Sequence, residues 1–176
     1  VGGLVGANVG GASITGCFAT GDVNGVFVAG RLVGNNQSGV ITSCYAKGSV
    51  SGSWGIAGLV SENSGTITKC FASGSVDGLE GTAGLVSQNG GYISNCYSDA
   101  NVVGDMTVGG LIAENTGVVT HCYSVGTVSG DDDVGALVGG QYSGSYTKCF
   151  WNRDINPDVN GIGNGSDPNV IGKTTA

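Results

Sequence analysis

Residues 58–78 read Gly-Leu-Val-Ser-Glu-Asn-Ser-Gly-Thr-Ile-Thr-Lys-Cys-Phe-Ala-Ser-Gly-Ser-Val-Asp-Gly, and this stretch decides the fold because its pattern recurs along the chain. It contains one of six cysteines spaced 26 or 27 residues apart: Cys17, Cys44, Cys70, Cys96, Cys122 and Cys149. An aromatic residue follows each cysteine, and a leucine comes 15 residues after each of the first five. Such a period predicts a solenoid, a propeller or another repeat array.

Each unit of about 26 residues contains three short β-favouring stretches separated by glycines. No stretch keeps the apolar spacing of a helix, and the unit is shorter than the ~40–45 residues of a propeller blade. We therefore predict an all-β fold, a parallel β-solenoid (β-helix) of about six coils. The general rule for parallel crossovers makes it right-handed.

The pattern breaks after Cys149, where Trp151 replaces a small residue and Pro157 replaces a glycine. We expect residues 1–150 to form the six-repeat solenoid and residues 151–176 an irregular C-terminal cap, with Trp151 lying over the last coil. The other end enters the repeat directly at Val1, which predicts flanking repeats or domains in a longer chain.

Side-chain alternation predicts which columns face inward. The cysteines and the residues two positions after them should be buried. Two further columns should also be inside: Ile14, Ile41, Ile67, Ile93 and Val119, with Tyr146 as the exception, and Val23, Val50, Val76, Val102, Val128 and Ile155. Strict alternation would turn the isoleucine column outward, so we expect a bend between it and the cysteines.

An amide stands four residues after each leucine: Asn8, Asn36, Asn63, Asn89, Asn115 and Gln141. Side-chain amides both donate and accept, so stacked copies can form a ladder. The row could instead bind a ligand, but its place in a turn that also holds a glycine favours the structural interpretation.

The recurring Gly-Leu-Val, together with Asn95-Cys96-Tyr97 and the Gly-Thr-Val-Ser-Gly of residues 126–130, resembles the GLUG-motif repeats of bacterial and archaeal surface proteins. The resemblance covers essentially the whole chain. It implies an extracellular or cell-surface prokaryotic protein, in a family that includes adhesin-like chains and large surface peptidases, and it supplies no catalytic residues.

The cysteines allow two interpretations. Copies in adjacent coils would lie ~4.8 Å apart, within the Cα range of a disulfide, and an even count in a surface protein favours bridges. Parallel Cβ vectors give poor bridge geometry, so the spacing favours a column of reduced, buried thiols.

No arrangement of residues points to catalysis, and we expect a protein that is not an enzyme. His121 is the only histidine, and its variable position predicts an exposed residue. A catalytic triad with a serine or cysteine nucleophile is not supported, because the chain offers no second histidine as a base. The cysteines also lack the close spacing of a zinc site.

Calcium is the one cofactor for which the sequence offers candidates, because hard cations prefer clustered oxygen ligands. A loop at the C-terminal end places oxygen side chains at the spacing of a calcium loop: Asn156, Asp158, Asn160, Asn164 and Asp167. An acidic corner, expected to bring its members together in stacked coils, holds Glu80, Asp105, Asp131, Asp132 and Asp133. For both, a solvated polar surface is the alternative.

The aromatic column holds Phe18, Tyr45, Phe71, Tyr97, Tyr123 and Phe150. Rings that face outward could stack on sugars or dock a partner, whereas rings that lie sideways would pack on one another. We expect a non-catalytic structural or adhesive repeat domain. The alternatives are a carbohydrate-binding module that uses this column, or an accessory region of a surface peptidase or polysaccharide-processing enzyme.

The amino-acid composition excludes some classes of binding partner. The formal net charge is −7, with six Lys and Arg against 13 Asp and Glu, so a basic surface for nucleic acid is not expected. The apolar stretches are far too short for insertion into a membrane. A glycan or a protein of a host or other cell surface fits better.

Overall fold

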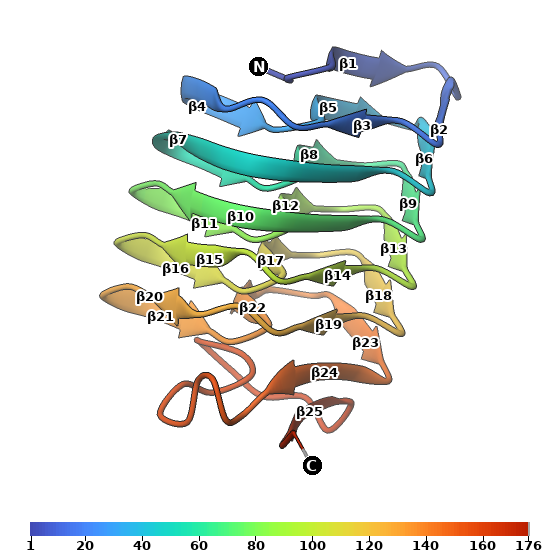
Figure 1. Ribbon diagram of the computed structural model, residues 1–176. Coiled ribbons are helices and arrows are strands. Elements are labelled where there is room, and N and C mark those ends of the chain that lie inside the picture. Colours follow the sequence, from blue (N-terminus) through green and yellow to red (C-terminus); the bar gives the residue numbers. More distant parts are fainter. Residues whose placement is uncertain (176) are drawn as a thin grey trace.

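The computed structural model describes residues 1–175, and every regular element among them is a β-strand. The chain winds from the N-terminus at one end to the C-terminus at the other as a stack of coils (Figure 1). All the strand pairs are parallel, and they join equivalent residues of successive coils, as in Ile14–Ile41 and Ile41–Ile67. The predicted parallel β-solenoid is confirmed, while its right-handed winding stays a prediction. Residues 1–175 contain no helix that could span a membrane.

Two of the three sheets have six strands each. The first contains β1 (Val5–Val9), β5 (Val33–Gln37), β8 (Val60–Asn63), β12 (Val86–Asn89), β17 (Ile112–Asn115) and β22 (Val138–Gln141). The second contains β2 (Ser13–Thr15), β6 (Val40–Thr42), β9 (Thr66–Thr68), β13 (Tyr92–Ser94), β18 (Val118–Thr120) and β23 (Ser145–Thr147).

The third sheet has 13 strands because most coils contribute more than one strand to it. It contains β3 (Phe18–Ala19), β4 (Val23–Gly30), β7 (Tyr45–Ala57), β10 (Phe71–Asp77), β11 (Glu80–Ala83), β14 (Tyr97–Ser98), β15 (Asn101–Val103), β16 (Met106–Gly109), β19 (Tyr123–Ser124), β20 (Val128–Ser129), β21 (Asp132–Gly135), β24 (Cys149–Asn152) and β25 (Val170–Lys173). In the third coil the chain leaves along β10, turns at Gly78–Leu79 and returns along β11. We call this outward excursion, repeated in the neighbouring coils, the arm.

The bend expected between the isoleucine and cysteine columns is present. The residue just before each cysteine has a left-handed backbone, with φ between 51° and 64°, and lies exposed. These residues are Gly16, Ser43, Lys69, Asn95, His121 and Lys148. Because such a residue reverses the local alternation, both columns can face inward, and Tyr146 is buried as well.

The interior is divided into two cores. The main core, between the three sheets, holds the leucine, isoleucine and cysteine columns. The second fills the arm with alanine, valine and isoleucine side chains, among them Ile56, Val76 and Val102. The arm is therefore a packed part of the domain, with its own hydrophobic stabilisation.

The valine column breaks in the last coil, where the prediction for Ile155 is wrong. Ile155 is 45% exposed, and Asn156 is buried in its place. The Asn156 side chain accepts a hydrogen bond from Val128 N (3.0 Å) and donates one to Gly126 O (2.9 Å). An amide suits this position because it satisfies backbone groups at the exposed edge of the last coil.

The C-terminal segment is more regular than the predicted irregular cap. β24 continues to Asn152, and β25 pairs with it as a further rung of the third sheet. Ile162 forms a bridge with Val138, and Leu137 N donates to Gly161 O. Residues 153–173 therefore form a partial seventh coil with irregular loops between its paired segments.

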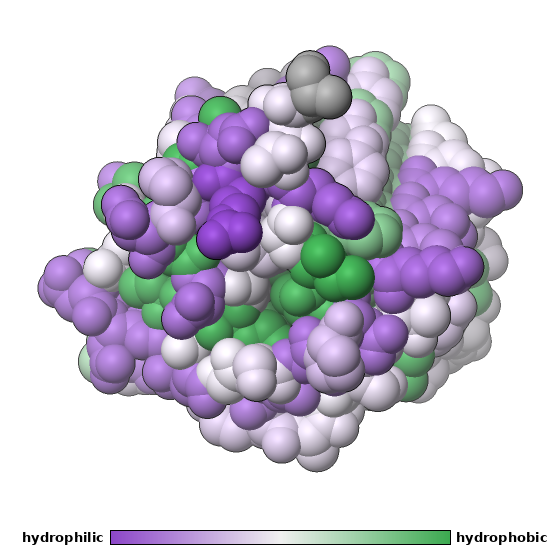
Figure 2. Space-filling model, turned by 90° about the horizontal axis from the view of Figure 1, so that it is seen from below, coloured by the Kyte–Doolittle hydropathy of each residue, from purple (hydrophilic) through white to green (hydrophobic). Residues whose placement is uncertain are grey.

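Trp151 lies in β24 near the C-terminal end of the stack, paired in register with Ser124 on one side and Gly172 on the other. It is 8% exposed, and its indole lies so close to Gly161 and Gly172 that a Cβ on either glycine would come within 2.8 Å of the ring. Figure 2 views this end directly and shows hydrophobic surface gathered inside a polar rim. Trp151, Val159 and Val170 help to line a hollow of about 400 Å³ there.

Candidate functional site

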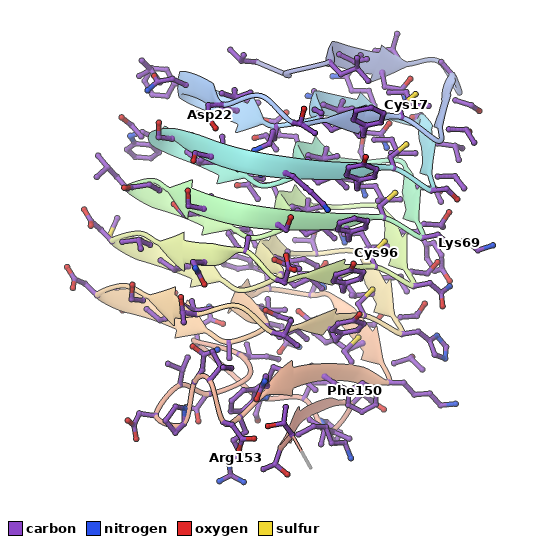
Figure 3. The ribbon with its side chains drawn as sticks, viewed as in Figure 1. Cys17, Asp22, Lys69, Cys96, Phe150 and Arg153 are labelled. Carbon is purple, nitrogen blue, oxygen red and sulfur yellow. The ribbon has the colours of Figure 1, made fainter. Side chains whose placement is uncertain are left out.

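The aromatic residues that follow the cysteines form a stacked column. From Phe18 to Tyr123, successive ring centroids are 4.9–5.2 Å apart and the ring planes differ by 1–9°. Figure 3 shows the rings one above another, with Phe150 at the lower end. Each ring inside the stack covers the faces of its neighbours, so a sugar could reach only ring edges. The geometry favours the packing interpretation, at ~0.5–1.5 kcal/mol per ring pair.

Phe150 departs from the column. Within the described chain it has no stacked aromatic partner, although its backbone pairs with that of Tyr123. Lys173 Nζ lies 5.5 Å from the centroid of the Phe150 ring, at cation–π distance. The last ring is therefore covered by the partial seventh coil rather than by another aromatic residue.

The asparagine row forms the predicted amide ladder. Nδ2 of each asparagine donates to Oδ1 of the next over four steps, from Asn8 to Asn115, with every N–O distance 2.8 Å. The same side chains bond backbone groups of their turn, as when Gly65 N donates to Asn63 Oδ1. Gln141 pairs with Asn115 through the backbone, but the described amide bonds end at Asn115. The ladder uses the donors and acceptors that a ligand would need, so its role is structural.

All six cysteines are free thiols, which agrees with the interpretation as a buried column. Cys17 is half-buried and the other five are buried, and the sulfur atoms follow one another along the stack (Figure 3). Each thiol donates to a carbonyl two residues earlier, as Cys96 Sγ does to Ser94 O (3.2 Å). Burial raises the pKa of the Cys149 thiol to about 11. A neutral, enclosed thiol is a packing residue and a poor nucleophile.

Several of the C-terminal calcium candidates already bond other groups of the chain. Both polar groups of the Asn156 side chain bind backbone atoms and are therefore engaged. Asn164 Oδ1 accepts from Gln141 N, and Asp167 Oδ1 accepts from Asn169 N. Asp158 and Asn160 are exposed. In residues 1–175 no three His, Cys, Asp or Glu side chains group as a metal site, and His121 lies at the surface.

The acidic corner brings Asp105 beside Asp131 and Asp132 in the next coil, but it sets Glu80 in another row. Glu80 pairs with Met106, which pairs with Asp132, so Met106 separates the two acids. At the tips of the arm, Asp105 N donates to Leu79 O in the coil before it, and Asp131 N of the next coil donates to Asp105 O. Glu80 and Asp105 therefore belong to different rows, because they occupy successive positions of the repeat.

Arg31, which stands where most repeats have glycine, is fully buried. Its guanidinium donates to Ser73 O and Ser75 O, both at 2.9 Å. Burial lowers its pKa to about 10, against a raising effect of Asp22. The sequence alone shows Arg31 only as a departure from the glycine of the motif. In the structure it ties the second coil to the third.

Sequence reasoning missed a groove between the arm and the first sheet. A hollow of about 260 Å³ lies between the arm and the first sheet, and a second hollow of about 450 Å³ adjoins it over the first sheet, because Glu62, Gln88 and Glu114 line both. These three residues form one outward row, since Glu62 pairs with Gln88 and Gln88 with Glu114. The facing wall is the returning strand of the arm, which contributes Trp54 and Glu80.

The groove is acidic and carries exposed aromatic residues. Phe27 and Trp54, register partners in adjacent coils, are 61% and 50% exposed. Asn35 Nδ2 donates to Glu62 Oε2. Burial, followed by the charge of Glu80, raises the pKa of the Glu114 carboxyl. The sequence signal for this site is the polar residue three positions after each of the four middle leucines: Asn35, Glu62, Gln88 and Glu114.

The family model described as the GLUG motif matches residues 1–24, which include Gly3-Leu4-Val5, Asn8 and Cys17. Comparison with curated proteins gives no match, and neither does comparison with solved structures. The matched residues pair in register with their counterparts in the second coil, and the same pairing continues down the stack. The match, which lies in the first coil, is consistent with the GLUG-type repeats that the sequence predicts.

Proposed function

We propose that this chain is a non-catalytic structural and adhesive domain of a secreted or cell-surface prokaryotic protein. The GLUG repeat and the β-solenoid fold fit a structural repeat domain. In such an array each coil contacts mainly its neighbours, and the length grows with the number of coils. The domain would hold a flanking part of the longer protein away from the cell wall and contact a glycan or a protein of another surface.

The amide ladder is the observation that supports this proposal most. It joins five successive coils through buried bonds of one length, beside a stacked aromatic column and a thiol column. All three rows connect coil to coil along the axis. Repeated axial contacts of this kind give a stiff body, as a spacer requires.

Surface location can be tested on intact cells of the source organism. An antibody raised against residues 1–176 should label unpermeabilised cells or the culture supernatant, and external protease should remove the cell-bound signal while a cytosolic marker survives. Labelling that appears only after lysis would contradict the proposed location.

Adhesion needs a separate measurement. Beads coated with the domain should bind cells or immobilised glycans more strongly than beads coated with an unrelated β-solenoid of similar charge. Equal binding by both kinds of bead would refute the adhesive part and leave the structural part standing.

A further inference from the structure

We propose that the groove between the arm and the first sheet binds a linear amino-sugar polysaccharide of the polyglucosamine type. Sugar rings would lie against Phe27 and Trp54, and the protonated amines would face Glu62, Glu80 and Glu114. The site goes beyond the proposed function, because it requires neither a surface location nor adhesion between cells.

The aromatic part of the groove differs from the stacked column in the way its rings are covered. Phe27 and Trp54 are register partners, and at least half of each side chain is exposed. Neither ring stacks on another ring in the described chain. Their faces are therefore open, whereas the faces of Tyr45, Phe71 and Tyr97 are occupied. An open aromatic face can take both the apolar face of a sugar and a nearby ammonium group.

The carboxylates give the groove one sign of charge. The lining of the two hollows contains Glu62, Glu80 and Glu114, and none of these described lining residues is Lys, Arg or His. Burial raises the pKa of the Glu114 carboxyl, and the nearby charge of Glu80 raises it further. A cationic ligand relieves this repulsion, because an opposite charge favours the ionised carboxyl. Gln88 and Asn35 add amide groups that can bond hydroxyls.

The shape of the groove favours a chain over a single small molecule. The lining of the two adjoining hollows runs from Phe27 in the first coil to Thr116 in the fifth, and equivalent residues repeat at the ~4.8 Å strand spacing. A polysaccharide presents a ring and an amine at every step along its axis. A lysine-rich peptide offers the same charge but no sugar face for the open rings, so the aromatic residues separate the two ligands.

The test is calorimetric titration of the intact chain with a glucosamine hexamer at low salt. The Trp54→Ala and Glu114→Gln variants should each weaken binding by about tenfold, equivalent to ~1.4 kcal/mol. Two matched controls should bind normally: Tyr92→Ala, an exposed aromatic on the second sheet, and Asp158→Asn, an exposed acid in the C-terminal segment. Circular dichroism checks that each variant is folded.

Three further ligands complete the test. The N-acetylglucosamine hexamer, which lacks the amine charge, should bind more weakly, and an oligogalacturonate should not bind. Hexalysine should bind weakly and without dependence on Trp54. The proposal is overturned if the glucosamine hexamer does not bind, if the control variants lose as much affinity as the groove variants, or if the acetylated hexamer or hexalysine binds equally well. None of these results bears on the cell-labelling experiment above.

Discussion

Removal of one amide from the middle of the asparagine ladder should destabilise the domain more than removal of the terminal amide. In Asn63→Ala, the bonds from Asn36 and to Asn89 are lost, both 2.8 Å long, together with the bond from Gly65 N. At about 1 kcal/mol for each net hydrogen bond, the loss is about 3 kcal/mol. Gln141→Ala removes no described ladder bond and should cost less than about 1 kcal/mol.

Pairs of substitutions give a sharper result. Asn36→Ala and Asn63→Ala each break two ladder bonds, but the double variant breaks three, because the two residues share one bond. The double variant should therefore be more stable than the sum of the single effects by about 1 kcal/mol. The pair Asn36→Ala and Asn89→Ala shares no bond, so its effects should add.

Urea unfolding followed by circular dichroism measures all of these variants. The two double variants change the same residue type in the same row and differ only in adjacency. If both pairs show the same coupling energy, or if Asn63→Ala is no less stable than Gln141→Ala, the ladder does not act as a chain of linked bonds.

Three other predictions follow from the buried columns and the C-terminal segment. In the native protein iodoacetamide should modify only Cys17 quickly, with the other five thiols reacting after unfolding, and mass spectrometry should count one against six. The urea midpoint should fall as pH rises above about 9, because burial raises the pKa of Cys149 from 9.0 to about 11 and that of Tyr146 to about 12, so the folded chain keeps protons that the unfolded chain releases. Cys149→Ala should reduce this fall of the urea midpoint. The difference should be clearest below pH 10, because above it the lowered pKa of Arg31 acts in the opposite direction. If the urea midpoint of this variant falls with pH as steeply as that of the unchanged chain, the raised pKa of Cys149 is not its cause. Deletion of residues 151–176 should uncover the last coil and cause concentration-dependent association in light scattering, and a truncated chain that stays monomeric and equally heat-stable would show that this segment is not needed as a cap.

Much of the main core could be predicted because six copies of one unit report on the same position. A column such as Ile41, Ile67 and Ile93 repeats one side chain at one place, so its burial follows from alternation and one bend. The same redundancy identified the amide ladder. The prediction fails where the copies end, as at Ile155, since a single segment with Asn156 beside it carries no repeated signal.

The arm and the groove were less accessible to sequence reasoning. A period of about 26 residues gives the length of a coil but not the path of the chain around it. Trp54 and Glu62 line the same groove only because of the angle between the arm and the first sheet. A left-handed residue recurs at one position of the returning strand, but its type varies among Val28, Gly55, Gly81, Thr107 and Asp133. Arg31 is hidden for a similar reason, because its partners lie in the following coil.

The left-handed residue before each cysteine has a consequence for how this surface can change. Its backbone is fixed by the corner of the coil, yet its side chain points to solvent, and glycine, serine, lysine, asparagine and histidine all occupy it. Substitution there changes surface chemistry without disturbing either core. The corner is thus a straight row of independently variable positions at ~4.8 Å intervals, on which natural selection or an engineer could place new chemical groups while the scaffold stays the same.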